Sequence, residues 1–214
     1  MSRDKDFVRD MLRLYAVTDR AWTGKQTLYE QVEAALMGGA TCVQLREKAL
    51  KHDDFLREAR QMRALCSRFG VPLMINDNVE IALACGADGV HVGQEDMDAK
   101  RIRDLAGGDF IIGVTAKTVP QAIAAQEAGA DYLGSGAVFG TTTKPGAKPM
   151  TLDLLTEIAH AAEIPVVAIG GICRENISRL AGTGVCGAAV VSGIFAAADI
   201  RREAEILRAC ADRF

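Results

Sequence analysis

The feature that most constrains the fold is a recurring phrase in which glycine ends a helical stretch and an apolar strand begins a few residues later. It occurs as Gly39-Ala-Thr-Cys-Val43, Gly86-Ala-Asp-Gly-Val90, Gly129-Ala-Asp-Tyr-Leu133 and Gly184-Val-Cys-Gly-Ala188. Glycine adopts the left-handed backbone conformation that ends a helix without the strain that a side chain would cause. The repeat therefore predicts a chain built from helix–strand units of one kind.

Hydrophobic periodicity along the chain predicts strands that alternate with helices. Strands are expected at 14–18, 41–46, 73–76, 89–92, 110–115, 132–138, 165–169 and 188–192. Helices are expected at 28–37, 53–69, 79–85, 120–128, 152–162 and 175–181, with a last helix after Asp199. Because strands that alternate with helices form parallel sheets, the chain is expected to hold one parallel sheet.

Eight such units favour an α/β fold of the (β/α)8 TIM-barrel type, with residues 1–214 forming a single domain. The alternative is an open, doubly wound sheet. That fold normally carries a GxGxxG turn after its first strand, and Thr18-Asp-Arg-Ala-Trp22 is not such a turn. In a barrel the active site lies at the carboxyl ends of the strands, where polar residues interrupt the apolar runs of this chain.

Composition argues against several classes of partner. A hydrophobic content of 49% allows a substantial core, and a net charge of −3 gives no overall attraction to nucleic acid or acidic membranes. No stretch reaches about 18 uninterrupted apolar residues, and the charged start lacks an apolar secretory core. The cysteines form no CxxC pair, which predicts reduced, buried thiols and a cytoplasmic protein. They are Cys42, Cys66, Cys85, Cys173, Cys186 and Cys210.

Polar side chains at the end of the second predicted strand indicate an anion site. Gln44, Arg46 and Lys48 stand at i, i+2 and i+4, a spacing that points all three to one face of a strand. Two cations suit a diphosphate, and the amide of Gln44 suits a ring nitrogen or amine of a heterocycle. The alternatives are ordinary surface charge and, for Gln44, hydrogen bonds to neighbouring backbone groups.

Asp77 and Asp96 follow the third and fourth predicted strands. Neighbouring barrel strands would bring both carboxylates within reach of one ion. Two carboxylates, with water and substrate phosphate oxygens, make a typical Mg²⁺ site. The alternative is that each aspartate caps the helix that follows it.

Glycine-rich ends of the last two strands predict a phosphate cradle. Ile169-Gly-Gly-Ile172 and Val190-Val-Ser-Gly-Ile194 follow strands seven and eight, whose loops often bind phosphate in such barrels. The segment Thr141-Thr-Thr-Lys-Pro145 would bind a carboxylate or a second phosphate, or form a solvated turn.

Other charged and titratable residues receive no functional role. Lys117 is treated as ordinary surface charge. His91 lies in the middle of a strand and is expected to be packed or hydrogen-bonded, and His52 and His160 have no evident Ser or Cys partner for nucleophilic catalysis.

Taken together, these motifs resemble the thiamine phosphate synthase family over nearly the whole chain. In order they are Gln44-Leu-Arg-Glu-Lys48, Asn76-Asp77, Gly93-Gln-Glu-Asp96, Thr141-x-Thr143-Lys144, Gly170-Gly-Ile172 and Val191-Ser192. That family joins hydroxymethylpyrimidine diphosphate to thiazole phosphate, or its carboxylated form, and releases thiamine phosphate and diphosphate. The resemblance implies a Mg²⁺-dependent transferase of thiamine biosynthesis that acts on small-molecule substrates.

The resemblance also implies roles for individual residues. The pyrimidine diphosphate would bind Gln44, Arg46, Lys48, Asn76, Thr115 and Lys144, of which Arg46, Lys48, Thr115 and Lys144 would be catalytic. Mg²⁺ would bind Asp77 and Asp96, and the thiazole phosphate would bind Thr141, Thr143, Gly171, Val191 and Ser192. The chain departs from the family where Thr115 replaces a usual serine and Gly140 stands where a proline often precedes the threonines.

Three other functions remain as alternatives. A thiazole tautomerase on the same scaffold would need a proton-transferring residue, and a phosphosugar isomerase or epimerase would need a general-base pair. A barrel that binds a phosphorylated metabolite without turnover is the third. Neither nucleic acid nor a membrane is expected as a partner, and a homo-oligomer is possible.

Overall fold

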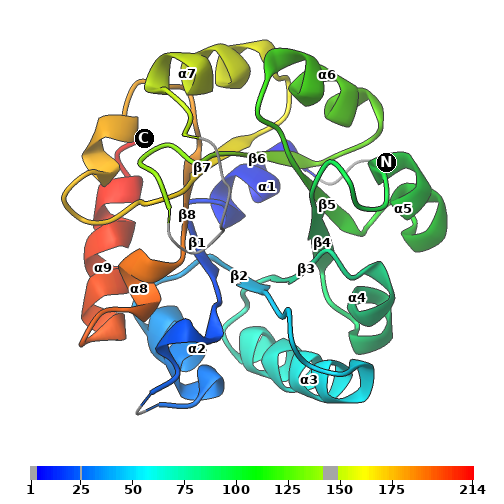
Figure 1. The fold of residues 1–214 in the computed structure, drawn as a ribbon, viewed down its shortest axis with the longest axis vertical. Helices are drawn as coiled ribbons and strands as arrows, with labels where there is room; N and C mark the ends of the chain where they lie inside the picture. Colours follow the sequence, from blue (N-terminus) through cyan, green and yellow to red (C-terminus); the bar gives the residue numbers. More distant parts are fainter. Residues whose placement is uncertain (1–3, 25, 142–148) are drawn as a thin grey trace.

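Eight parallel strands close into a barrel, and each strand pairs with the strands before and after it in the chain (Figure 1). The computed structural model describes residues 4–24, 26–141 and 149–214. The strands are β1 (Leu14–Val17), β2 (Cys42–Leu45), β3 (Leu73–Asn76), β4 (Gly89–Val92), β5 (Ile111–Thr115), β6 (Tyr132–Gly136), β7 (Val166–Ile169) and β8 (Gly187–Val190). The predicted (β/α)8 fold is confirmed.

Helices form a ring outside the barrel (Figure 1). They are α2 (Leu28–Met37), α3 (His52–Arg68), α4 (Val79–Cys85), α5 (Ala99–Ala106), α6 (Val119–Glu127), α7 (Leu152–Ala161) and α9 (Ile200–Ala211). Shorter helices are α1 (Lys5–Met11), α8 (Ser192–Phe195) and the 3-10 turns η1 (Arg20–Trp22) and η2 (Ile177–Leu180).

Gly39, Gly86 and Gly129 follow the ends of α2, α4 and α6 within two residues, as predicted, whereas Gly184 lies four residues beyond the end of η2. Gly39, Gly86, Gly129 and Gly184 have φ angles of 94°, 69°, 94° and 85°. These angles lie in the region that strains residues with a side chain. The repeat in the sequence is therefore a repeat of backbone conformation, and it sets the start of β2, β4, β6 and β8.

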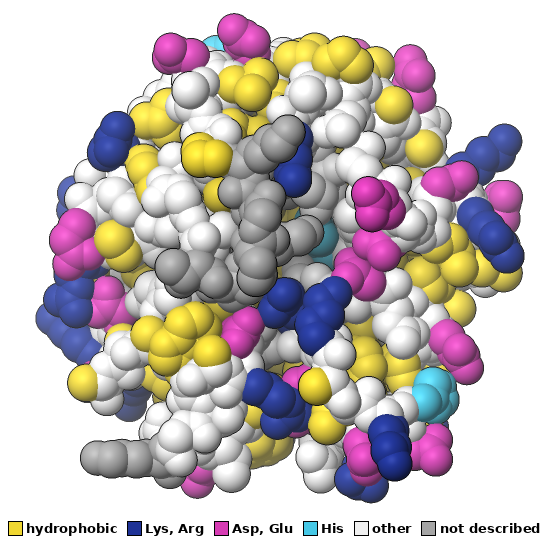
Figure 2. Space-filling view, viewed as in Figure 1, with side chains coloured by type: hydrophobic (Ala, Val, Ile, Leu, Met, Phe, Trp, Pro, Cys, Tyr) yellow, Lys and Arg dark blue, Asp and Glu magenta, His cyan; other side chains and the backbone are white. Residues whose placement is uncertain are grey.

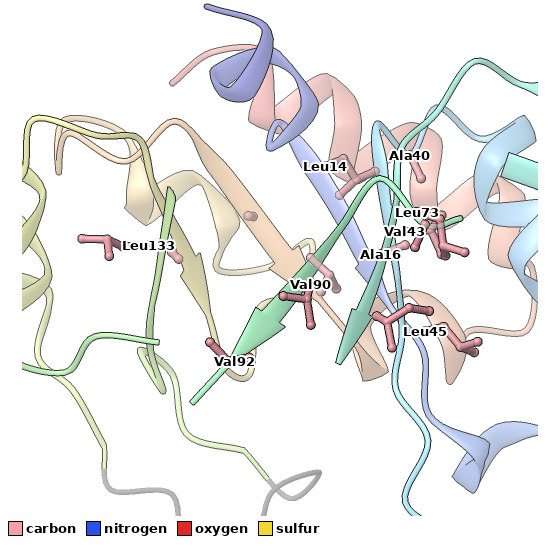
Figure 3. Packing of buried hydrophobic residues seen from close by; sticks show 14 of the residues in the cluster. Leu14, Ala16, Ala40, Val43, Leu45, Leu73, Val90, Val92 and Leu133 are labelled. Atoms are coloured by element: carbon pink, nitrogen blue, oxygen red, sulfur yellow. The ribbon is translucent and has the colours of Figure 1, made fainter. Parts of the chain in front are cut away.

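Alternate residues along each strand belong to two separate cores. Leu14 and Ala16 of β1 join the large cluster between barrel and helices, part of which Figure 3 shows. Tyr15 and Val17 join the smaller cluster inside the barrel. Since successive strand side chains point to opposite faces, this parity also decides which polar residues reach the barrel interior.

One end of the barrel is closed by the N-terminal helix. Val8 and Met11 of α1 pack, together with Leu12, into the inner cluster, which also contains Met74 and Ile111. In Figure 1, α1 lies behind the strands. Hydrophobic periodicity does not predict this helix, because its apolar residues stand among charged ones.

Several predicted boundaries are wrong. The helix expected at 175–181 is only the 3-10 turn η2, followed by two glycines, Gly182 and Gly184, with positive φ. Helix α5 was missed because its only large apolar residues are Ile102 and Leu105. Strand β8 ends at Val190, two residues before its predicted end.

Six cysteines are free thiols in the structure, as expected from their scattered positions. Cys42, Cys66, Cys85 and Cys186 are buried, whereas Cys173 and Cys210 are half-buried. Burial raises the pKa of the Cys66 thiol to about 12, although the guanidinium of Arg63 opposes the shift. None of the described helices combines the length and the apolar character that crossing a membrane requires.

Candidate functional site

A cavity of about 180 Å³ lies at the carboxyl ends of the strands. The predicted site residues that line it are Gln44, Arg46, Lys48, Asn76, Asp77, Asp96, Thr115, Thr141, Gly171, Val191 and Ser192. Thr143 and Lys144 lie outside the described residues. In Figure 2, basic and acidic side chains lie side by side near the middle of this face. Residues from seven different stretches of chain therefore converge on one pocket.

The end of β2 delivers an amide and two cations to this pocket. Gln44 is the third residue of β2 and is 4% exposed, and Arg46 and Lys48 follow the strand. The backbone N–H of Arg46 donates to Thr18 Oγ1, and its guanidinium donates to Asp19 Oδ2 at 2.9 Å. Lys48 Nζ lies 2.6 Å from Asp77 Oδ2. The three side chains line one pocket, as their spacing predicted.

Neither aspartate of the candidate metal pair caps a helix. The α4 N-cap is Asn78, whose side chain accepts the Ile81 N–H, and the α5 N-cap is Asp98. Asp77 instead holds a φ of 60°, and its N–H donates to the carbonyl of His91. Its left-handed conformation turns it out of the helix start, and the capping alternative is therefore wrong.

Asp77 and Asp96 interact with each other through their side chains. Burial raises the pKa of Asp77, but the hydrogen bond and charge of Lys48, together with hydrogen bonds to Asp96 and Asn76, outweigh burial and hold this pKa below its ordinary value. Burial raises the pKa of Asp96; Gly93, which donates its N–H to Oδ2 at 2.8 Å, lowers it, and the charge of Asp77 adds to the rise. Two carboxylates that repel each other beside a substrate pocket are a donor set that suits Mg²⁺.

Among the described residues that line the pocket, Asp77 and Asp96 are the only carboxylates. The described residues contain no group of three or more His, Cys, Asp or Glu side chains placed to hold one metal ion. An ion held by Asp77 and Asp96 would complete its shell with water and substrate oxygens, as Mg²⁺ commonly does.

Two glycines let the loops after β6 and β7 pack closely. A Cβ on Gly170 would lie 2.5 Å from Ala137 Cα, and one on Gly171 would lie 2.5 Å from the carbonyl oxygen of Gly140. Asn176 fixes the same turn by donating its amide to the Gly171 carbonyl at 2.9 Å. The glycine-rich sequence thus makes one wall of the pocket.

Ser192 is the first residue of α8, and the expectation that it ends a strand is wrong. Val191 precedes it as the N-cap residue. The first N–H groups of a helix have no partner within the helix, and they attract anions. The combination of this helix start with Gly171 in one pocket fits a phosphate group.

The two departures from the family pattern differ in their structural meaning. Thr115 keeps its hydroxyl in the pocket, where Oγ1 lies 3.0 Å from His91 Nε2. Gly140 has a φ of 77°, which proline cannot adopt because its ring holds φ near −65°. The loop after β6 therefore follows a path in this chain that a proline at 140 would prevent.

Sequence reasoning missed several residues that line the pocket. Lys117, which follows β5, lines it, so its treatment as surface charge is wrong. Tyr15 and His91 also line it, and His91 is hydrogen-bonded as expected, to Tyr132 and Thr115. The inward parity of Tyr15 and His91 in their strands could have revealed both.

Comparisons with known proteins agree with one another. A sequence model of the family described as thiamine monophosphate synthase matches residues 14–194. A thiamine-phosphate synthase of Ruminiclostridium cellulolyticum is 49% identical over 91% of this chain and 92% of its own. One from Clostridium acetobutylicum is 44% identical over 91% and 92%. The solved thiamine phosphate pyrophosphorylase of Pyrococcus furiosus has a TM-score of 0.89 and 37% identity, covering 96% of this chain and 98% of its own.

Proposed function

The chain belongs to the thiamine monophosphate synthase family and is a transferase of thiamine biosynthesis, and from this premise we propose its substrates, its metal and the roles of its residues. It couples hydroxymethylpyrimidine diphosphate with thiazole phosphate, or the carboxylated thiazole phosphate, in the presence of Mg²⁺. The products are thiamine phosphate and diphosphate, and the carboxylated substrate also releases its carboxyl group as carbon dioxide. One observation carries this proposal: the pocket holds two cations and a pair of interacting carboxylates side by side.

The leaving diphosphate needs positive charge around it. Arg46 and Lys48 supply two cations, and Lys117 adds a third along the wall formed after β5. Asp77 and Asp96 would hold Mg²⁺, which supplies further charge neutralisation for the diphosphate when bound. Fixed charges aimed at a developing negative charge lower the barrier without reorganising during the reaction.

Asp19 holds one of these cations in place. It accepts a hydrogen bond from the Arg46 guanidinium, and both side chains are largely buried, with exposures of 16% and 19%. The other Asp19 oxygen accepts the N–H of Ala21 at the start of η1. The Arg46 head group is therefore fixed before any substrate arrives.

The two substrates occupy different walls of the pocket. Gln44 and Asn76 at the ends of β2 and β3 orient the pyrimidine, and Gly171, Val191 and Ser192 orient the thiazole phosphate. Cleavage of the bond between the pyrimidine methylene carbon and the diphosphate oxygen leaves that carbon electron-poor, and the thiazole nitrogen attacks it. The aminopyrimidine ring delocalises the positive charge, so the reaction requires no protein nucleophile, and the chain mainly positions reactants.

The test is a direct assay with purified protein, both substrates and Mg²⁺, following thiamine phosphate and diphosphate. We expect both products in equal amounts, their loss in EDTA and their return when Mg²⁺ is restored. An Arg46→Ala variant should lose on the order of 10²-fold in kcat/KM, as expected for one preorganised charge. Arg57→Ala removes an exposed ion pair with Asp54 on α3 and serves as the matched control.

Two outcomes would contradict the proposal. Product formation unaffected by EDTA would remove the metal from the scheme. Binding of thiazole phosphate without any coupled product would favour the tautomerase or the binding protein.

A further inference from the structure

A continuous chain of hydrogen bonds crosses the barrel interior between two residues of the pocket. Gln44 Nε2 donates to the Tyr15 hydroxyl at 2.7 Å, which lies 2.9 Å from the Tyr132 hydroxyl. The Tyr132 hydroxyl lies 3.0 Å from His91 Nδ1, and His91 Nε2 lies 3.0 Å from Thr115 Oγ1. The chain therefore joins β2 to β5 through residues of β1, β6 and β4.

Inward-facing glycines make room for this chain. A Cβ on Gly113 would lie 2.1 Å from the Tyr132 ring, and one on Gly134 would lie 2.8 Å from His91 Cε1. Tyr132 is fully buried and is not among the residues that line the pocket. It therefore connects the two ends without touching a ligand.

Each hydroxyl in the chain has one proton to give, which makes the chain directional. Burial raises the pKa of both Tyr15 and Tyr132 well above the ordinary value, so both phenols keep their protons. Tyr15 accepts from Gln44, and the distances permit either tyrosine hydroxyl as the donor of the next bond and either role for His91 Nδ1. In the direction that we assign, Tyr15 donates to Tyr132 and Tyr132 donates to His91 Nδ1. The Cys42 thiol also contacts Tyr15, and burial raises the pKa of this thiol, so it keeps its proton.

The direction determines what each end offers to a ligand. With Nδ1 as acceptor, neutral His91 holds its proton on Nε2 and donates it to Thr115. The Thr115 hydroxyl then directs its own proton to the pocket. At the other end the Gln44 N–H is engaged with Tyr15, which leaves Oε1 as the amide group that accepts from a ligand.

We propose that Tyr15, Tyr132 and His91 are positioning residues that set Gln44 as an acceptor and Thr115 as a donor, and so select an aminopyrimidine over its oxo analogue. This inference rests on the proposed function, because it concerns the pyrimidine substrate of that reaction. An exocyclic amine donates to Gln44 Oε1. An oxo group at the same position offers only an acceptor.

Binding the oxo analogue would disturb both ends of the chain. Gln44 would have to rotate its amide so that its N–H faced the ligand and Oε1 faced Tyr15. Tyr15 and Tyr132 would then reverse their donation, His91 would move its proton to Nδ1, and Thr115 would donate to Nε2. The ligand would lose the Thr115 proton as well as the amine contact.

The first test is Tyr132→Phe, which removes the middle of the chain without altering the pocket wall. Its kcat/KM for the aminopyrimidine diphosphate relative to the oxo analogue should fall about tenfold, mainly through a higher KM for the amino substrate. The KM for thiazole phosphate should stay within about twofold. Tyr15→Phe, which cuts the link to Gln44, should behave alike and replaces Tyr132→Phe if that variant does not fold.

Tyr29→Phe is the matched control. Tyr29 lies on α2, where its hydroxyl accepts from Arg68 at 3.0 Å, outside the barrel. It should leave the preference for the amino substrate unchanged. An unchanged preference in both Tyr132→Phe and Tyr15→Phe, in folded proteins, would overturn the inference.

A second readout does not depend on turnover. Nitrogen-15 NMR of the histidine rings, assigned with His52→Gln and His160→Gln, should find the His91 proton on Nε2 in the unmodified protein. The same spectrum of Tyr132→Phe should lose this single tautomer. A proton on Nδ1 would overturn the proposed direction, whereas the Nε2 tautomer in a protein without coupling activity would leave the chain supported and contradict the proposed function.

Discussion

Asp77 carries a backbone conformation that few residues other than glycine adopt. Its φ of 60° lies in the left-handed region, where Asp and Asn are tolerated better than other side chains. The carboxylate there contacts Lys48 and Asp96. Strained backbone of this kind is often found at functional sites. Two substitutions of Asp77 can separate the effect of its backbone conformation from the effect of its carboxylate.

Asp77→Asn should keep the conformation and lose the charge. We expect turnover to fall at least about 10²-fold, by comparison with the loss of one charge-stabilising group, with a melting temperature close to that of the unmodified protein. Asp77→Ala should lose the same activity and also about 1–2 kcal/mol of unfolding free energy, because alanine is strained at this φ.

Asp98→Asn is the control for this pair. Asp98 caps α5 by accepting the Arg101 N–H, and asparagine is an equally good cap. Activity and urea unfolding should both remain unchanged in this variant. Near-normal turnover of Asp77→Asn across a Mg²⁺ titration would contradict the metal-ligand assignment.

At the scale of elements, the loops after β6 and β7 depend on glycines for two separable reasons. Gly171 has a φ of 64°. A Cβ at this position would lie within 2.6 Å of the carbonyl oxygens of Phe139 and Gly140. Gly182, after η2, has a φ of 83° with no atom within 4 Å of its Cβ position. The first glycine is needed for both conformation and space, the second only for conformation.

Gly182→Ala should therefore cost about 1–2 kcal/mol of unfolding free energy and leave the KM for thiazole phosphate unchanged. Gly171→Ala should cost more and raise that KM, because the added methyl pushes the two loops apart at the phosphate wall. Chemical denaturation and steady-state kinetics of both variants check this. Equal unfolding free energies for the two would show that the close approach contributes nothing.

Arg20 of η1 connects the first two loops of the barrel mouth. Its Nε lies 2.5 Å from Glu47 Oε1, and its Nη2 lies 2.6 Å from Oε2 of Glu58 on α3. Burial raises the pKa of Glu47 despite Arg20. A carboxyl with a raised pKa in the folded state gives stability that is complete below its unfolded pKa of about 4.3 and is lost as pH rises through the folded value.

Comparison with Glu47→Gln, whose side-chain amide does not titrate, should reveal this pH-dependent contribution to the free energy of unfolding. Relative to this variant, the unmodified protein should lose stability as pH rises from about 4.3 through the raised pKa of Glu47 in the folded state, measured by urea unfolding. Glu205→Gln on α9 is the control with the opposite sign, because Arg202 and Arg201 lower the pKa of the exposed Glu205. If the unmodified protein instead gained stability relative to Glu47→Gln as pH rises, the prediction would be contradicted.

Local patterns predicted the parts of the site that depend on one strand. The alternation around Gln44 and Arg46 sufficed to aim them at the pocket, since strand parity is a property of consecutive residues. Whether Asp77 or Asn78 caps α4 depends on one backbone angle, which the sequence does not reveal. The contact of Tyr15 with Tyr132, separated by 117 residues, depends on the register of the whole barrel and was missed.

At the scale of the molecule, α1 gives the barrel a closed floor. Val8 and Met11 pack against the inner core, and the described part of the cavity lies at the opposite end. Gln44 lies deep and is 4% exposed, whereas Ser192 and Gly171 lie partly open at the rim. Substrates and products therefore share one mouth.

A shared mouth imposes an order in time on the reactants. If the substrates bind as proposed, the pyrimidine diphosphate enters before thiazole phosphate covers the rim, and thiamine phosphate leaves before the next cycle begins. High concentrations of thiazole phosphate should therefore slow the initial rate, and raising the pyrimidine diphosphate should relieve the inhibition. Initial-rate measurements over both concentrations test this, and rates that rise to a plateau with thiazole phosphate at every pyrimidine concentration would contradict it. The seven-residue helix α1 closes the far end of the barrel. The order in which reactants use the open end is therefore a consequence of this helix.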